Sequence, residues 1–287
     1  MHPFDYEAPA TLEDALELLA EHRDDAKLLA GGQSLVPILN YRLAKPRVVV
    51  DINDLPLAAI RVADGHLSLG ALVRHHHLEE SADIARHCPL LKEAAALIGN
   101  VRVRTLGTVG GSLAHADPAA ELPLVLIALD ARVNVRSARE HRTLTARDFF
   151  AGYLTTALAP DELITDIEVP VLGDAGYAVE EFARRAGDFA LVAALAVVRV
   201  SARGRIETAR LAFGGVGSTP LRVGAAEDVL VGHEPSEERL ARAATVAAAA
   251  LEPQDDAFAS AAYRRLLAQV LSRRALARAV ARALEVA

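Results

Sequence analysis

A glycine pair interrupts the chain between two apolar segments and limits what the surrounding residues can form. In the segment "LLAGGQSLVPIL", residues 28–39, a short strand pattern runs up to Gly31-Gly32, and two small polar side chains follow before the next apolar run. Glycine has no Cβ, so its backbone can turn freely and can approach another group closely. The pair therefore predicts either a tight turn or a backbone segment that contacts a ligand.

A second glycine pair, Gly110-Gly111, lies in the similar segment "TVGGS", residues 108–112. Exposed backbone N–H groups in such loops can hold anionic oxygens, and serine and threonine add hydroxyl donors. Two facing loops of this kind suit a pyrophosphate, although two ordinary turns are the alternative. The chain has neither G-x-x-x-x-G-K-[ST] nor a G-x-G-x-x-G after its first strand, so a dinucleotide here would not bind to a Rossmann fold.

The hydrophobic patterns predict an α+β chain whose two parts meet near "GDAG", residues 173–176. The first helix is expected within residues 8–22, with Thr11 and Asp14 at capping-box spacing, and a second over residues 35–41. The chain from about residue 220 is expected to be helical. The expected strands are 27–30, 47–52, a hairpin over 60–71, 133–136, 163–169, 177–184, 192–200 and 206–213.

The composition excludes several classes of protein. A net charge of -7 argues against a general nucleic-acid surface, and no apolar stretch reaches the ~20 residues that span a bilayer. The N-terminus has no signal-peptide pattern, so we expect a cytoplasmic protein without a membrane span. The single cysteine, Cys88, cannot supply the four thiolates of an iron–sulfur cluster, and we expect it to be a reduced, half-buried thiol.

Four stretches together resemble one known family. "LLAGGQSLVPILNYRLAKPRVVVDI" and "VRVRTLGTVGGSLAHADPAAELPLVL" are similar to the flavin-binding medium subunit of molybdenum hydroxylases of the carbon monoxide dehydrogenase and xanthine dehydrogenase type. "EEFARRAGDFALVAALAVV" and "AFGGVGSTPLR" resemble the C-terminal domain of that subunit. The stretches occur in the family's order and cover essentially the whole chain.

The resemblance implies a fold and a domain organisation. It implies a two-subdomain FAD-binding domain of the vanillyl-alcohol-oxidase/PCMH-like kind over residues 1–175, with subdomains of about 1–53 and 54–175. FAD would lie extended between these subdomains. A C-terminal domain with a three-stranded antiparallel sheet and helices would follow over residues 176–287.

The resemblance also implies the residues that contact noncovalently bound FAD, and it implies no catalytic or metal-binding residue. The first pyrophosphate loop would be Ala30, Gly31, Gly32, Gln33 and Ser34, and the second would be Thr108, Val109, Gly110, Gly111 and Ser112. Ile98 and Leu163 would give apolar contacts beside the ring or the adenine, and Asp117 and Glu121 would give polar contacts near the ribityl chain and ring. Phe189 would be the aromatic contact beside the isoalloxazine.

Several other residues have competing interpretations. Neighbouring histidines on a helix point in different directions, so we do not expect His75, His76 and His77 to share a metal ion. His115 lies inside the second glycine stretch, but the resemblance argues against a covalent flavin bond. Arg102 and Arg104 could approach a phosphate or a partner, or form a solvated pair. The i, i+4 series Arg274, Arg278 and Arg282 reads as a solvated face, with a subunit contact as the alternative.

The function implied by the resemblance is electron transfer. FAD on this subunit would take electrons from [2Fe–2S] clusters on a small partner subunit and pass them to an external acceptor. The molybdenum cofactor would lie on a large molybdopterin subunit, within a dimer of heterotrimers. The alternatives are a stand-alone FAD-dependent reductase or oxidase of related fold, and a structural subunit that no longer binds flavin.

Overall fold

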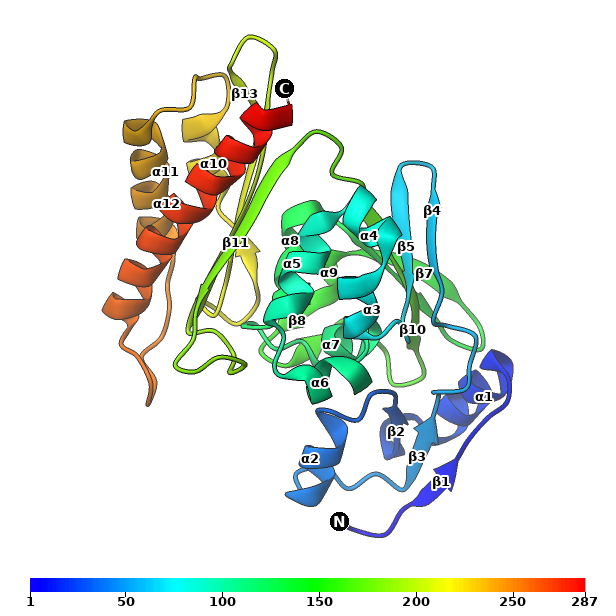
Figure 1. The fold of residues 1–287 in the computed structure, drawn as a ribbon. Helices are drawn as coiled ribbons and strands as arrows, with labels where there is room; N and C mark the ends of the chain where they lie inside the picture. Colours follow the sequence, from blue (N-terminus) through cyan, green and yellow to red (C-terminus); the bar gives the residue numbers. More distant parts are fainter. Residues whose placement is uncertain (287) are drawn as a thin grey trace.

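The computed structural model describes residues 1–286 and shows three bodies in chain order (Figure 1). A small N-terminal subdomain, drawn in blue, lies beside a larger second subdomain, drawn in cyan and green. The C-terminal domain, from light green to red, packs on the helical side of the second subdomain. Strand β3 ends at Asp51 and β4 begins at Ile60, while β10 ends at Pro170 and β11 begins at Gly176, so the joints between the bodies are short loops.

The N-terminal subdomain is a three-stranded parallel sheet with the order β1-β3-β2. Thr11 caps the helix that follows β1, because its Oγ1 accepts a hydrogen bond from the Asp14 N–H at 3.1 Å, as the capping-box spacing predicts. The expected helices and two of the strands are present. Strand β1 was not predicted, since all three of its residues are exposed and carry no alternating pattern. The elements are β1 (Asp5–Glu7), α1 (Leu12–His22), η1 (Arg23–Asp25), β2 (Ala26–Leu29), α2 (Leu35–Asn40) and β3 (Val48–Asp51).

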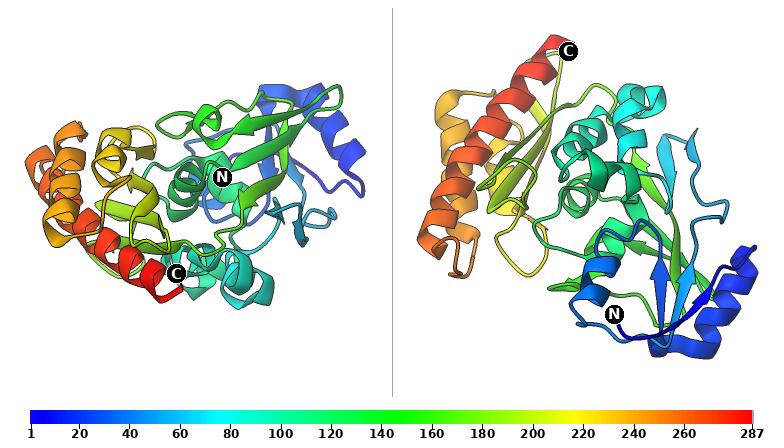
Figure 2. Two further views of the ribbon diagram at one scale, coloured as in Figure 1. Left: turned by 90° about the horizontal axis from the view of Figure 1, so that it is seen from above. Right: turned by 60° about the horizontal axis from the view of Figure 1, so that its bottom comes forward.

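The second subdomain is a five-stranded antiparallel sheet with the order β4-β5-β10-β6-β7, and its helices lie between this sheet and the C-terminal domain (Figures 1 and 2). Helix α8 is buried along its whole length, because it packs on β10 below and on β12 and β13 above. The elements are β4 (Ile60–Ala63), β5 (His66–Gly70), α3 (His75–Glu80), α4 (Ala82–His87), α5 (Pro89–Leu97), α6 (Val101–Leu106), α7 (Val109–His115), α8 (Glu121–Leu129), β6 (Arg132–Arg136), β7 (His141–Thr145), α9 (Ala146–Phe149), β8 (Phe150–Gly152), β9 (Thr155–Thr156) and β10 (Leu163–Pro170).

The C-terminal domain is an antiparallel sheet with the order β11-β12-β13-β14, covered on one face by helices. The three long strands were predicted. The fourth, β14, has two residues, which is too short to show alternation, so the expectation of a three-stranded sheet was wrong by this edge strand. The elements are β11 (Gly176–Phe182), β12 (Val192–Val200), β13 (Ile206–Gly214), β14 (Leu221–Arg222), α10 (Gly224–Leu230), α11 (Glu237–Ala250) and α12 (Ala261–Val286).

Two arginines of α12 join the C-terminal domain to the second subdomain. Arg282 forms an ion pair with Glu93 of α5 at 2.7 Å, and Arg278 approaches the same carboxylate at 3.7 Å. Arg278 also pairs with Glu180 of β11, although Arg278 and Arg274 are both exposed. The interpretation of all three arginines as a solvated face was therefore wrong for Arg282, which is half-buried and binds within the chain, and Arg278 combines an exposed side chain with ion pairs inside the chain.

Cys88 is fully buried between α4 and α5, not half-buried as expected. Burial raises the pKa of its thiol to about 12, so the side chain is an uncharged thiol at neutral pH. No helix of the described residues 1–286 is long and apolar enough to cross a membrane.

Candidate functional site

A cavity of about 610 Å³ lies where the two N-terminal subdomains meet, and a loop of the C-terminal domain closes one end. All the predicted cofactor contacts line this cavity except Val109 and Asp117. Val109 is fully buried, and Asp117 accepts a hydrogen bond from the Ala119 N–H in the turn before α8. The wall is formed by some residues of each of the segments 28–38, 71–75, 98–121 and 158–164. Ile52, Gly187, Asp188 and Phe189 complete it.

The first glycine pair brings the two subdomains into direct backbone contact. A Cβ on Gly31 would lie 2.3 Å from the carbonyl oxygen of Leu106, so no other residue fits there without displacing the second subdomain. Gly32 has a φ of +68°, a left-handed conformation that side chains disfavour. Both glycines are therefore explained by the chain's own geometry, and the same geometry places their loop in the cavity wall.

The backbone of the first loop offers unused donors to the cavity. Within residues 1–286, none of the N–H groups from Gly31 to Ser34 donates a hydrogen bond to another residue. The side-chain amide of Gln33 donates to the Gly31 carbonyl at 2.8 Å, and that of Asn53 donates to the Ala30 carbonyl at 2.9 Å, so these two carbonyls already have partners within the chain. Successive free N–H groups form the kind of concavity that binds an anionic oxygen.

The second glycine pair works differently from the first. The N–H groups of Val109 and Gly110 donate to the carbonyls of Val73 and Ala71 at 2.9 and 2.8 Å, and the Gly111 N–H donates to Thr108 Oγ1 at 3.0 Å. These donors are therefore used inside the chain, and the expectation that this pair forms a second nest of free N–H groups was wrong. The segment is the start of α7, and its polar contribution to the cavity comes from hydroxyl side chains.

Two glycines of α7 allow close packing around these hydroxyls. A Cβ on Gly110 would lie 2.7 Å from the Cβ of Ala71, and one on Gly111 would lie 2.7 Å from Thr108 Oγ1. Only Gly32 among the four paired glycines has a positive φ. Val109 points into the core beneath, so its N–H and its side chain are both committed there and we no longer assign it a ligand contact.

Asn53 and Arg74 connect the two loops and were not expected from the sequence. The guanidinium of Arg74 donates to Asn53 Oδ1 at 2.7 Å and to the Leu106 carbonyl. Asn53 in turn donates to Asp51 Oδ1 at 2.6 Å. The two contacts of Arg74 join residues 21 and 32 positions apart in the chain, so no local pattern could show them.

Glu121 lies in the first turn of α8, is 4% exposed and lines the cavity. Burial raises the pKa of its carboxyl to about 8, and the charges of Glu181 and Asp117 act in the same direction. Burial also raises the pKa of Glu181 to about 7, and its Oε2 has no hydrogen-bond partner among the described residues. A neutral Glu121 can donate a hydrogen bond into the cavity as well as accept one.

Phe189 stands at one end of the cavity and is 53% exposed. Its loop is held against the second subdomain, because Gly187 has a φ of +84° and a Cβ there would lie 2.9 Å from the Gly99 carbonyl oxygen. Phe189 is therefore not part of the hydrophobic core. Ile98 and Leu163, by contrast, are 8% and 1% exposed and give the cavity apolar walls.

The remaining basic side chains near the cavity are held by the chain. Arg104 forms an ion pair with Glu79 at 2.7 Å and donates to the carbonyls of Ile98 and Gly99 at 3.1 and 3.3 Å. The alternative of a solvated pair was therefore wrong for Arg104, whereas Arg102 is exposed. His75 is buried in the cavity wall and His77 is exposed, so these neighbouring histidines do face different ways.

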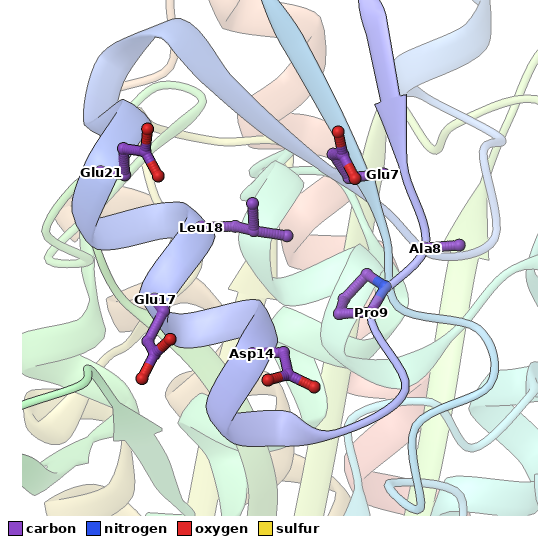
Figure 3. A pocket seen from close by; sticks show the side chains of 7 residues that line it. All are labelled: Glu7, Ala8, Pro9, Asp14, Glu17, Leu18 and Glu21. Atoms are coloured by element: carbon purple, nitrogen blue, oxygen red, sulfur yellow. The ribbon is translucent and has the colours of Figure 1, made fainter.

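A smaller hollow on the N-terminal subdomain differs in charge from this cavity. It lies between the end of β1 and α1, as Figure 3 shows, and has a volume of about 350 Å³. Glu7, Asp14, Glu17 and Glu21 surround it. Four carboxylates would repel an anionic dinucleotide, so this hollow does not suit the ligand that the two loops suit.

The main cavity fits FAD in its chemistry. Free backbone N–H groups on one side and the hydroxyls of Thr108 and Ser112 on the other provide donors for a pyrophosphate, and apolar walls extend on both sides for ring systems. No lysine or arginine lines the described wall, so anionic oxygens would be held by neutral donors. An α+β fold with such a cavity between two subdomains places the chain in the class of proteins that bind a flavin dinucleotide outside a Rossmann fold.

Comparison with known families identifies the group within this class. Residues 2–172 match the FAD binding domain in molybdopterin dehydrogenase, and residues 177–279 match the CO dehydrogenase flavoprotein C-terminal domain. The chain therefore belongs to the FAD-binding medium subunits of the molybdenum hydroxylase family. It is an oxidoreductase subunit with an FAD-binding domain.

Individual relatives and solved structures agree with this assignment over nearly the full length. The chain is 43% identical to the 6-hydroxypseudooxynicotine dehydrogenase complex subunit alpha of Paenarthrobacter nicotinovorans, covering 98% of this chain and 95% of the relative. It is 38% identical to the carbon monoxide dehydrogenase medium chain of Afipia carboxidovorans, covering 98% of both. The structure of quinoline 2-oxidoreductase from Pseudomonas putida 86 has a TM-score of 0.95 at 36% identity and covers 99% of both chains.

Proposed function

We propose that this chain carries noncovalent FAD and transfers electrons within a molybdenum hydroxylase complex. The observation that supports this most is the cavity itself, with free N–H groups from Gly31 to Ser34 on one side and the hydroxyls of Thr108 and Ser112 on the other. Bound FAD would supply two-electron redox chemistry there. The chain's own residues bind and orient the cofactor and tune its surroundings, which is the usual task of a protein around a redox cofactor.

The proposed roles follow from position. The free N–H groups of the first loop and the Ser112 hydroxyl hold the pyrophosphate. Ile98 and Leu163 provide apolar surface beside a ring system, and the protonated carboxyl of Glu121 donates a hydrogen bond. Phe189 lies at the mouth of the cavity, where a half-exposed aromatic side chain controls which acceptor approaches. His115 also lines the wall, and we assign it a noncovalent contact.

The source and destination of the electrons lie outside this chain. Its single cysteine is buried as an uncharged thiol, so [2Fe–2S] clusters would be held by a small partner subunit and the molybdenum cofactor by a large molybdopterin subunit. We propose the dimer of heterotrimers as the assembly. Relatives named for nicotine, caffeine and carbon monoxide share this type of subunit, which supports placing substrate choice on a partner.

The test combines a spectrum with a purification. The full chain is expressed with and without an affinity tag in its native host, and FAD is added to the isolated chain. We expect a flavin absorption spectrum, release of all flavin on acid denaturation, reduction by dithionite but not by a hydroxylase substrate, and co-purification of iron–sulfur and molybdenum subunits. Turnover of a substrate by the isolated chain would favour a stand-alone reductase or oxidase, and failure to bind FAD would favour a structural subunit.

A further inference from the structure

His75 has a geometry that neither the family assignment nor the proposed roles explain. It is the first residue of α3, is 3% exposed, and lies in the cavity wall beneath the start of α7. Its Nε2 is 3.0 Å from the carbonyl oxygen of Thr108 and also 3.0 Å from Ser112 Oγ. One ring nitrogen therefore contacts both the backbone and a side chain of the segment that holds the second glycine pair.

These contacts determine which ring nitrogen carries the hydrogen. A carbonyl oxygen can only accept, so Nε2 must be the protonated nitrogen that donates to Thr108. Burial lowers the pKa of His75 to about 4, which keeps the ring neutral at physiological pH and leaves Nδ1 without a hydrogen. Because Nε2 has no lone pair in this tautomer, Ser112 Oγ can accept from it but cannot donate to it.

As a consequence, the Ser112 hydroxyl can act only as a hydrogen-bond donor toward a ligand in the cavity. Within residues 1–286, Ser112 Oγ has no other hydrogen-bond partner, and Ser112 is part of the cavity wall. Its hydroxyl hydrogen therefore has nothing to bind in the chain and is left for a ligand. If the imidazole were absent, the Thr108 carbonyl, four residues earlier in the chain, could accept the Ser112 hydroxyl hydrogen instead. The serine would then present an oxygen lone pair to the ligand, which would repel an anionic group.

The packing around the ring shows that the imidazole is accommodated at a cost to stability. Nδ1 is buried and has no hydrogen-bond partner among the described residues. A Cβ on Gly107 would come within 2.8 Å of both Nδ1 and Cε1, so this third glycine leaves room for the ring. An unpaired buried acceptor destabilises a fold, and a purely structural position would be better filled by an apolar side chain.

We propose that His75 is a positioning residue that holds the Ser112 hydroxyl as a hydrogen-bond donor toward the pyrophosphate of FAD. This inference rests on the proposed FAD site. It predicts that the imidazole acts through its Nε2–H group, and that Ser112 carries the effect to the ligand.

The test compares two amides that place their donor differently. Glutamine can place its Nε2–H₂ group near the position of the imidazole Nε2, whereas the shorter asparagine reaches only the position of Nδ1. FAD affinity of the full chain is measured by quenching of flavin fluorescence, with the melting temperature of each apoprotein as the fold check. The matched control is His77→Asn, at the exposed neighbouring histidine.

The expected values follow from the strength of a hydrogen bond to a charged group. His75→Asn and Ser112→Ala should each weaken FAD binding by about tenfold to hundredfold. His75→Gln should bind within about threefold of the wild type, as should His77→Asn. In the double variant His75→Asn/Ser112→Ala the loss should not exceed that of Ser112→Ala alone, since the histidine acts through the serine.

Four results would overturn the inference. Wild-type affinity in His75→Asn, or additive losses in the double variant, would show that His75 does not act through Ser112, while the FAD site itself would stand. Equal losses of affinity and of melting temperature in the Asn and Gln variants would assign His75 a structural role. A wild-type chain that fails to bind FAD would overturn the proposed function as well.

Discussion

Replacing Gly31 by alanine should separate the two loops that form the cavity. The new Cβ would lie 2.3 Å from the Leu106 carbonyl oxygen, 2.8 Å from Gly107 Cα and 2.9 Å from the Leu106 carbonyl carbon. All three are backbone atoms of the other subdomain, so they cannot rotate away as a side chain would. The two segments must therefore open to at least 3.0 Å, the lower limit of real Cβ contacts.

The size of the effect can be worked out from this contact. Overpacking of this kind costs about 1–3 kcal/mol of unfolding free energy. For a chain of roughly this size, each kcal/mol lowers the melting temperature by about 2–4 °C. Opening the contact also moves the free N–H groups of the first loop away from Ser112, so a ligand held between them would make at least one of its hydrogen bonds at a lengthened distance. Losing one hydrogen bond to a charged group should weaken FAD binding by roughly tenfold or more.

Alanine substitutions at two other glycines provide matched controls for Gly31→Ala. For each variant, the melting temperature of the apoprotein measures stability, and quenching of flavin fluorescence measures FAD affinity. Gly32→Ala introduces strain of about 1–2 kcal/mol at its positive φ, but its Cβ would meet only side chains of its own subdomain. Gly111→Ala would meet the Thr108 hydroxyl, which can rotate but then loses its cap bond to the residue 111 N–H, at about 1 kcal/mol. Alanine in this helix gains about 1 kcal/mol, so the two effects roughly offset each other. Gly111→Ala should therefore keep the melting temperature while weakening FAD binding. If Gly31→Ala keeps both the melting temperature and the affinity of the wild type, the backbone contact between the loops is not as described.

Phe189→Ala should change the apoprotein melting temperature little, because the side chain is 53% exposed, but it should alter the rate at which reduced flavin reacts with acceptors; a large loss of apoprotein stability contradicts this. The pKa of Glu121 is about 8 in the folded chain against an ordinary value of 4.5, so the native state retains a proton that the unfolded chain releases between these values. The unfolding free energy of the apoprotein should therefore fall between pH 4.5 and 8, by at most about 1.4 kcal/mol per pH unit, and Glu121→Gln should flatten this slope in denaturant titrations at several pH values. Cys88, with its pKa raised to about 12 by burial, should resist thiol reagents at pH 8 in the native chain and react at once in denaturant; fast native reaction would show that its site opens.

Local patterns were enough to predict most of the elements and the segments that form the site. The capping pair Thr11 and Asp14, the apolar face of α1 and the long strands β11 to β13 each depend on residues close together in the chain. The two glycine pairs indicated where backbones come close, and both pairs line the cavity. The short strands β1 and β14 were missed because two or three residues held in place by a neighbouring strand need no pattern of their own.

Only the tertiary structure decided what the residues of the site do. Two similar glycine segments have different roles, because Val73 and Ala71 accept the N–H bonds of the second segment while nothing in the described chain accepts those from Gly31 to Ser34. His75 belongs to a run of three histidines, yet its partners lie 33 and 37 residues further along the chain. The hydrogen-bond partner of a backbone or ring N–H depends on which distant segment packs against it. That packing is decided when the whole chain folds, so local sequence patterns do not reveal it.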